Sequence, residues 1–187
     1  LAEFYEKGIG VEKNESRARE ILDACKYEAE GYYQCGRFYR DGIGGPVDTG
    51  KAISKFKQAV ELAHSKAAYE LGLLLLGRAL PNRRVNEAIE YLGMAMEQGQ
   101  GLAAKQLGLL YLKGDGVSVN IEVAKEYFDK ATALGIEGLE DLLISHISGF
   151  SKSTQKGRNL TRRYVVLDFE TTGFAANAHH VVEIGAI

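Results

Sequence analysis

Apolar residues recur along most of this chain at intervals of three and four, which is the spacing of amphipathic α-helices. The clearest pair of segments has its apolar residues at Ala103, Leu107, Leu110 and Tyr111 in the first half and at Ala124, Tyr127, Phe128 and Ala131 in the second. Residues three or four apart lie on the same face of a helix. The pattern therefore predicts two antiparallel helices in this stretch.

The helix pair repeats along the chain with a period of about 36 residues. One set of aligned positions, here called the marker positions, is occupied by Leu1, Cys35, Leu71 and Leu107, and a second set by Ala18, Ala52, Ala88 and Ala124. Both sets step by 34, 36 and 36 residues. Repeated helix pairs bury their apolar faces by stacking on one another. We therefore predict an all-α solenoid over residues 1–148, with residues 138–147 as a terminal helix that covers its last apolar face.

Short glycine-containing segments separate the two helices of each unit. Three of them read Gly8-Ile9-Gly10, Gly42-Ile43-Gly44 and Gly114-Asp115-Gly116. Glycine takes the positive φ angles that end a helix and turn the chain tightly. Asn14, Asp48 and Asn120 follow and are predicted to cap the second helices. The third unit lacks the second glycine and has Arg84 at the capping position, so we expect Pro81 to end its first helix.

Composition says little about the partners of the repeats, but it distinguishes the repeats from the residues that follow them. The 187 residues are 45% hydrophobic and carry a formal net charge of −2. The longest apolar run, Leu71 to Leu76, is too short to cross a bilayer, so no membrane partner is expected. Between Asp141 and Asp168 the charged residues are all basic, namely Lys152, Lys156, Arg158, Arg162 and Arg163.

One complete unit carries Ala103, Leu107, Gly108, Tyr111, Gly114, Gly116, Val117, Asn120, Ala124, Tyr127, Ala131 and Gly135. This pattern resembles the Sel-one-like repeat (SLR) family, which is related to tetratricopeptide repeats, and the likeness covers about three quarters of the chain. The resemblance implies a right-handed superhelix of helix-turn-helix repeats with a concave face. It also implies a role as an adaptor in protein complexes, with no cofactor for the repeats.

The two cysteines allow a further expectation. The resemblance implies that cysteine-rich members pair a cysteine after the second-helix alanine with one near the start of the next helix. Cys25 fits the first of these places, but Cys35 occupies a marker position and should point into the core. We therefore expect free thiols.

The first helices predict a protein-binding or peptide-binding groove on the concave face. If they line that face, the positions two before, two after and five after each marker point into it. These positions hold Tyr33, Arg37, Arg40, Tyr69, Leu73, Leu76, Lys105, Leu109 and Leu112. A peptide with apolar anchors and an acidic group towards Arg37 and Arg40 would suit such a groove. The alternative is that the leucines only pack between neighbouring helices.

After the repeats the helical period is lost. Residues 149–163 are polar and basic, which is typical of a linker. The β-branched run that begins at Tyr164, and a second one from Val181 to Ile187, predict a β-hairpin over 164–187. Asp168 and Glu170 would share one face of its first strand, where two carboxylates favour Mg²⁺ or Mn²⁺.

The segment from Asp168 to Gly173, followed by Val182-Glu183-Ile184-Gly185-Ala186, resembles the first motif of DEDD-family 3′–5′ exonucleases. The resemblance covers about 24 residues and implies the opening of an α/β exonuclease-like domain. It implies that Asp168 and Glu170 bind two catalytic metals, which activate water and stabilise the leaving oxygen. Thr171 and Thr172 would lie beside the terminal nucleotide of a nucleic acid. The later aspartates and the histidine of the family are expected beyond Ile187.

The sequence thus predicts an interaction scaffold that forms part of a longer, metal-dependent 3′–5′ exonuclease. The alternative is an adaptor with no nuclease role. The exonuclease resemblance favours a cytoplasmic location.

Overall fold

The computed structural model describes residues 1–24, 28–77 and 84–145, and within these ranges the chain is helical with no strand. The helices are α1 (Ala2–Lys7), α2 (Glu15–Ala24), α3 (Ala29–Asp41), α4 (Thr49–Glu61), α5 (Ser65–Leu76), α6 (Val85–Glu97), α7 (Gly101–Lys113) and α8 (Ile121–Ala133). A further helical segment covers residues 139–145. The predicted helix-pair solenoid is therefore confirmed over these residues.

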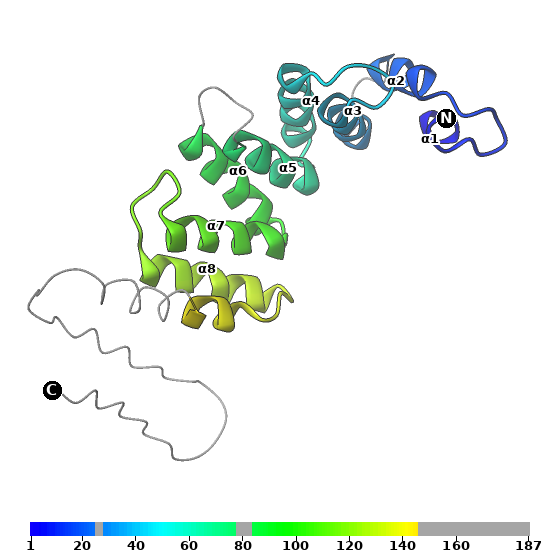
Figure 1. The fold of residues 1–187 in the computed structure, drawn as a ribbon. Coiled ribbons are helices and arrows are strands. Elements are labelled where there is room, and N and C mark those ends of the chain that lie inside the picture. The colour runs from blue at the N-terminus through cyan, green and yellow to red at the C-terminus, as the bar shows by residue number, and fades with distance from the viewer. Residues whose placement is uncertain (25–27, 78–83, 146–187) are drawn as a thin grey trace, which may run out of the picture.

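The helices stack in chain order into an elongated, bent array (Figure 1). Each unit is an antiparallel pair, α1 with α2, α3 with α4, α5 with α6 and α7 with α8, and the second helix of a unit packs on the first helix of the next. In the view of Figure 1, α1, α3 and α5 lie along the inner side of the bend, and α2, α4 and α6 lie along the outer side. These three first helices thus present one continuous side of the solenoid in this view.

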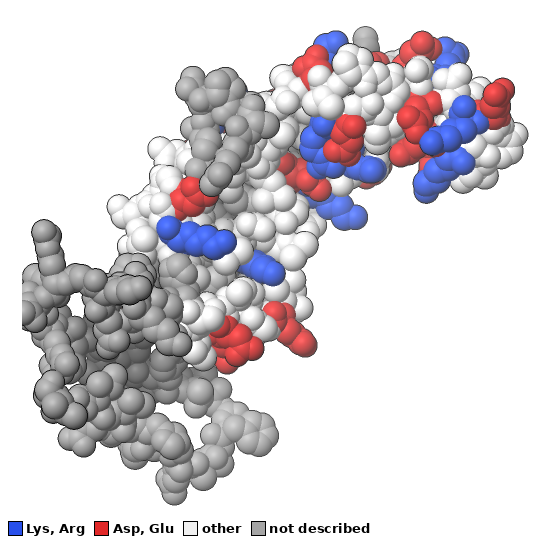
Figure 2. Space-filling view, in the orientation of Figure 1, with Lys and Arg blue, Asp and Glu red and all other residues white. Residues whose placement is uncertain are grey.

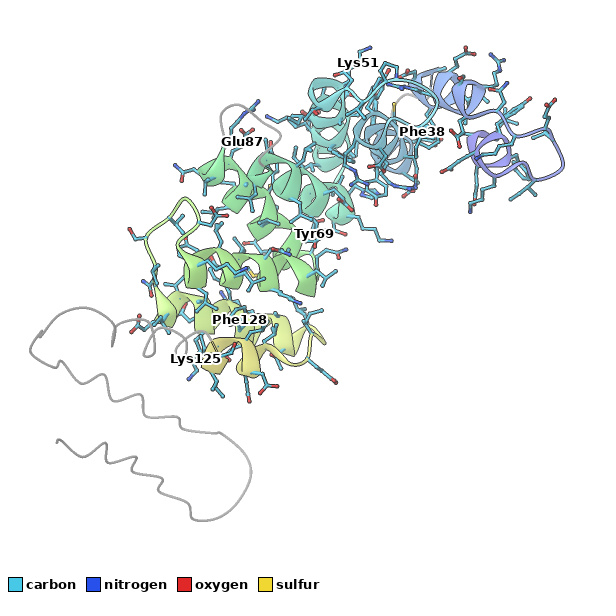
Figure 3. The ribbon with its side chains drawn as sticks, viewed as in Figure 1. Phe38, Lys51, Tyr69, Glu87, Lys125 and Phe128 are labelled. Atoms are coloured by element: carbon cyan, nitrogen blue, oxygen red, sulfur yellow. The ribbon has the colours of Figure 1, made fainter. Side chains whose placement is uncertain are left out.

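In the second, third and fourth units a glycine follows the marker residue and lets the two helices of the unit approach closely. A β-carbon on Gly36 would lie 2.6 Å from the ring of Phe56, and one on Gly72 would lie 2.6 Å from Cγ of Leu92. On Gly108 it would lie 2.5 Å from Cε1 of Phe128, whose side chain fills the space between α7 and α8 (Figure 3). Carbon atoms cannot approach to these distances, so the contact between the helices depends on glycine.

The predicted turns and caps are confirmed. All six glycines of the three glycine turns have positive φ angles, between 66° and 88°. Asn14 accepts a hydrogen bond from the backbone N–H of Arg17, and Asp48 accepts one from that of Lys51. Asn120 accepts the equivalent bond from Val123. These side chains satisfy backbone donors that the first turn of a helix leaves without partners.

The third unit achieves the same helix pair without these devices. Its first helix, α5, ends at Leu76 and is followed by Gly77 in an extended conformation. Arg84 precedes α6 and makes no capping hydrogen bond through its side chain. The predicted stop at Pro81 lies outside the described residues, and α5 already ends before it.

The segment 139–145 covers the end of the array, as expected for a terminal helix. Leu139 and Leu143 are buried against Leu112 and Phe128 in one cluster. Ile144 occupies the position that is glycine in the preceding units, and its side chain is 53% exposed. The predicted end of this helix at residue 147 lies outside the described residues, as do the linker 149–163 and the hairpin 164–187.

Candidate functional site

The residues predicted to form a groove lie on the first helices of three successive units. We define the A-helix face by these residues, which are Tyr33, Arg37 and Arg40 on α3, Tyr69, Leu73 and Leu76 on α5, and Lys105, Leu109 and Leu112 on α7. Helical periodicity places the three residues of each helix on one side of it. In Figure 1, α3 and α5 follow the inner side of the bend. We call the set of nine residues on α3, α5 and α7 the strip.

The aromatic end of the strip is fixed by contacts between α3 and the start of α5. The ring of Tyr33 stacks on that of His64 with 4.5 Å between centroids. His64 Nδ1 accepts a hydrogen bond from the backbone N–H of Ala67, and its Nε2 lies 3.0 Å from Glu30. A neutral ring whose Nδ1 accepts must carry its proton on Nε2, so Nε2 donates to Glu30. His64 therefore caps α5 and joins two repeats at once.

Arg40 is enclosed by carboxylates. Its Nε and Nη2 donate to the two carboxylate oxygens of Asp41 at 2.7 and 2.9 Å, and its Nη1 donates to Glu70 of α5 at 2.6 Å. The hydrogen bond with Asp41, and the charges of Glu70 and Asp41, raise the pKa of Arg40 against the opposing effect of burial. The positive charge of Arg40 is thus already balanced by Asp41 and Glu70. This pairing was not predicted from the sequence.

The other two cations of the strip differ from Arg40. Arg37 Nη1 donates to the neutral side chain of Gln34 at 2.6 Å. Neither Arg37 nor Lys105 forms an ion pair with any residue in the described ranges. Both side chains are half-buried. Two cations that form no ion pair with the residues that the structure describes thus lie at opposite ends of the strip, on α3 and α7.

The apolar residues of the strip contribute unequally to packing. Leu112 is 2% exposed and belongs to the cluster beneath the terminal helix, so it is a core residue. Leu76 and Leu109 are half-buried and pack against the hydrophobic clusters. Leu73 is half-buried too, but it packs against none of the clusters formed by the described residues. Leu73 is therefore the leucine of the strip that is most available to a partner.

Tyr69 lies beside Leu73 on α5, on the side that faces α7 (Figure 3). Its hydroxyl lies near the side chain of Gln106 of α7, which opposes the rise of the Tyr69 pKa. Burial, and then the charge of Glu70, raise the pKa of Tyr69 and also that of Tyr33. Both phenols consequently stay neutral at physiological pH and can donate or accept hydrogen bonds.

The charge distribution separates the two halves of the solenoid. Figure 2 shows side chains of both signs crowded over α1 to α3, and a mostly uncharged surface with few charged groups over α5 and α7. A surface whose middle is weakly charged is suited to apolar contacts, and charges at its borders can orient a ligand.

A second polar cluster, which the sequence did not predict, joins the first and second units. Asp23 of α2 accepts hydrogen bonds from the Tyr39 hydroxyl at 2.6 Å and the Cys35 thiol at 3.2 Å, and Lys55 lies 3.6 Å away. Burial, and then the bond with Asp23, raise the pKa of Cys35 to about 12. The thiol is therefore protonated, and the cluster is structural. Cys35 is buried and free, as expected, whereas Cys25 lies outside the described residues.

The residues predicted for nuclease chemistry cannot be placed. Asp168, Glu170, Thr171 and Thr172 lie outside the described residues. Within those that are described, His, Cys, Asp and Glu side chains form no group of three that could hold a metal ion. In the same ranges no helix is both long and apolar enough to span a membrane.

Comparison with known proteins identifies the repeats. The profile described as "Sel1 repeat" matches residues 1–23, 29–64, 65–100 and 101–136. A Sel1 repeat protein of Oxalobacter formigenes superposes with a TM-score of 0.62 at 27% identity, covering 72% of this chain and 56% of that one. A protective antigen of uropathogenic Escherichia coli that displays an SLR fold superposes with a TM-score of 0.66 at 25% identity, covering 84% and 33%.

Curated relatives are longer than the matched region. DAP3-binding cell death enhancer 1 of Rattus norvegicus is 30% identical over 93 residues, which are 50% of this chain and 18% of that protein. An uncharacterized protein of Neisseria meningitidis is 28% identical over 137 residues, which are 72% of this chain and 28% of that protein. The chain thus spans less than a third of the length of these relatives.

Proposed function

Because the chain belongs to the Sel1 repeat family, we propose that it is a protein–protein interaction scaffold whose A-helix face binds a peptide segment of a partner protein. The observation that carries this proposal is the strip across α3, α5 and α7, in which a half-buried apolar middle lies between two cations that form no ion pair within the described ranges. Binding sites for peptides combine apolar anchors with a few polar groups that fix orientation.

The stacked repeats give this strip the rigidity that peptide binding needs. Adjacent units are tied by Glu30 to His64 and by Arg40 to Glu70 along the first helices. Lys57 of α4 pairs with Glu87 of α6 at 2.6 Å along the second helices. A surface held in place before binding loses little conformational entropy when the ligand arrives. One relative, DAP3-binding cell death enhancer 1, is named for a binding partner, which agrees with a scaffold role.

The competing explanation is that the leucines of the strip only pack between helices. This explanation accounts for Leu112, which is buried, and in part for Leu76 and Leu109, which contact the clusters. It does not account for Leu73, which is half-buried and packs against none of these clusters. The proposal therefore depends on Leu73, Tyr69 and the two cations more than on the remaining leucines.

The test is a charge substitution on the strip. A partner is first identified by affinity capture and mass spectrometry and then purified, and its affinity for the wild-type chain is measured by calorimetry. The double variant Arg37→Glu with Leu73→Glu should weaken binding at least tenfold, because it removes an apolar contact and reverses a charge. Circular dichroism must show that the variant is folded.

The matched control is Lys125→Glu on α8, which reverses an exposed charge on a second helix. It should leave the affinity of the partner unchanged within a factor of two. A folded strip variant that binds as tightly as the wild type would disprove binding through the A-helix face.

The tail supports a second candidate function for the parent protein, a metal-dependent 3′–5′ exonuclease. This proposal rests on the run from Asp168 to Gly173 and on the later Val182-Glu183-Ile184-Gly185-Ala186. Asp168 and Glu170 would hold Mg²⁺ or Mn²⁺, and Thr171 and Thr172 would contact a nucleic acid. The repeats would then position the nuclease on a protein assembly, most simply in the cytoplasm.

This candidate is tested on the gene product extended beyond Ile187 as far as the reading frame allows. A 3′-labelled single strand is incubated with the protein and Mn²⁺, beside an Asp168→Ala variant. Digestion by the wild type alone would establish the exonuclease. Absence of digestion by folded protein, or a frame that ends at Ile187, would favour the adaptor without a nuclease role.

A further inference from the structure

The A-helix face carries three cations, and the structure distinguishes them. The charge of Arg40 is balanced by Asp41 and Glu70 through three hydrogen bonds of 2.6–2.9 Å. A ligand carboxylate at Arg40 would have to displace one of these carboxylates or share the guanidinium with both, and would then be repelled by them. Arg40 is therefore a structural residue that joins α3 to α5.

Arg37 and Lys105 have the opposite character. Arg37 retains guanidinium donors beyond the single bond to Gln34, and Lys105 makes no ion pair within the described ranges. Both side chains are half-buried, where a charge is less well solvated than in open water. A carboxylate brought by a ligand would restore the interactions that water supplies only in part.

The region between the two cations is apolar. Leu73 and Tyr69 of α5 are both half-buried, and Leu109 follows on α7. Leu73 occupies the position two after the marker, as Arg37 does in the unit before. The order along the solenoid is therefore cation, apolar patch, cation.

The spacing of the helices sets the length of a matching ligand. Side chains reach directly from α3 to α5, through Arg40 and Glu70, and from the start of α7 to α5, through Gln100 and Ser65. Neighbouring helices lie about 10 Å apart, so two steps from α3 to α7 span about 20 Å. An extended peptide advances by about 3.3 Å per residue and covers this distance in about six residues. The chain's own segment 149–163 is basic and therefore does not complement these cations.

We infer that the A-helix face selects an extended peptide with an acidic residue at each end of a short apolar core, about six residues apart, one carboxylate binding Arg37 and the other Lys105. This inference rests on the proposed peptide-binding function and specifies its ligand. It replaces the simpler expectation of one acidic group shared by Arg37 and Arg40.

A peptide-display selection tests this inference without knowledge of the natural partner. A random twelve-residue library is selected on the intact 187-residue chain, on the folded variants Arg37→Glu and Lys105→Glu, and on Leu73→Asp. Peptides from the wild-type selection should be enriched in two Asp or Glu residues around leucine, isoleucine or phenylalanine. Synthetic representatives should bind each charge variant about fivefold or more weakly.

The charge variants also provide a result that loss of folding cannot imitate. Selection on Arg37→Glu should replace acidic by basic residues at one end of the peptide, and selection on Lys105→Glu should do so at the other end. Lys125→Glu on α8 serves as the comparison outside the strip, and peptides selected on it should keep the wild-type acidic pattern at both ends.

Each alternative outcome has a distinct meaning. Apolar peptides that lose binding to Leu73→Asp, but show no acidic enrichment, would overturn this inference and leave the proposed function intact. Peptides that bind Leu73→Asp as tightly as the wild type, or a selection that enriches nothing, would overturn both. If sedimentation shows a dimer of the unliganded chain that Leu73→Asp abolishes, the strip binds a second copy, and the inference is wrong.

Discussion

The second and third repeats form the same pair of packed helices with different local chemistry. The second has two glycines of positive φ in its turn, an aspartate that caps α4, and Cys35 at the marker position beside Asp23. In the third repeat, an extended Gly77 follows α5 and Arg84 precedes α6. Its marker position is occupied by the apolar Leu71. The two repeats share few of their local stabilising devices.

What they do share is the glycine after the marker, which lies against a large side chain of the second helix. Gly36 lies against Phe56, and Gly72 lies against Leu92 and the carbonyl of Ala88. Turns and caps determine where helices begin and end, whereas the close contact between the helices determines how they pack. The comparison indicates that the contact is the requirement of the repeat, and that turn and cap chemistry can vary around it.

The largest effect is expected when this shared contact is disrupted in both repeats. Gly36→Ala and Gly72→Ala should each lower the free energy of unfolding by about 1–3 kcal/mol, because the new methyl group forces the facing side chain to move. The loss should be greater for Gly36→Ala, since the Phe56 ring has fewer rotamers than Leu92. Guanidinium unfolding followed by the helical circular dichroism signal measures both.

The control is Gly93→Ala on α6, where a β-carbon would have nothing within 4 Å. It should raise the free energy of unfolding by up to about 1 kcal/mol, as alanine favours helix over glycine. If all three substitutions had the same effect, the close contact would not be what the two repeats have in common.

The features that were predicted correctly from the sequence are those set by residues close together in the chain. Asn14, Asp48 and Asn120 cap their helices because a capping side chain needs only the backbone three residues ahead. The positive φ angles of the glycine turns were likewise predicted, because these turns recur at the same place in three units. His64 was missed although it caps α5, because histidine is seldom used in this role and gives no clear signal.

The features that were missed depend on contacts between repeats. Spacing placed Arg40 on the strip but could not show that Glu70, thirty residues later, would pair with it. Spacing also placed Leu112 there, and its burial depends on the terminal helix through Leu139 and Leu143. Periodicity indicates the direction of a side chain from its own helix, and the neighbouring helix determines whether that side is covered.

The next largest effect is expected at Asp23 of α2, which accepts a hydrogen bond from Cys35 at the marker position of the second repeat. Burial alone would raise the pKa of the Asp23 carboxyl, but hydrogen bonds from Tyr39 and Cys35, together with Lys55, lower it overall. Replacing Asp23 by Asn should lower the free energy of unfolding by about 1 kcal/mol at pH 7, a modest value because the carboxylate is partly exposed to water.

The pH dependence gives this prediction its sign. A carboxyl whose pKa is lower in the folded state stabilises the protein at pH values above its unfolded pKa, about 3.9, and loses that contribution as the pH falls through the folded value. The difference between wild type and Asp23→Asn should therefore shrink below about pH 4. A difference that stays constant from pH 7 to pH 2.5 would show that the ionised carboxylate is not responsible.

An effect of about the same size is expected when the cap of the second repeat is removed, and a smaller one when Arg84 of the third repeat is replaced. Asp48→Ala should lower the free energy of unfolding by about 1 kcal/mol, because the backbone N–H of Lys51 loses its acceptor. Arg84→Ala should change it by less than about 0.5 kcal/mol, since Arg84 makes no capping bond and only an exposed ion pair with Glu87. Equal losses at the two positions would contradict the assignment of Asp48 as the cap.

The smallest expected effect comes from giving the third repeat the cap that it lacks. Arg84→Asn should raise the free energy of unfolding by about 0.5 kcal/mol, because its side chain can accept from the backbone N–H of Glu87, as Asn120 accepts from Val123. The loss of the exposed Arg84–Glu87 pair offsets part of the gain. The reference is Arg84→Ala, which loses the same ion pair without supplying a cap. Asn and Ala variants of equal stability would mean that the start of α6 cannot adopt the capping geometry of the other repeats, and that the two repeats differ in backbone as well as in sequence.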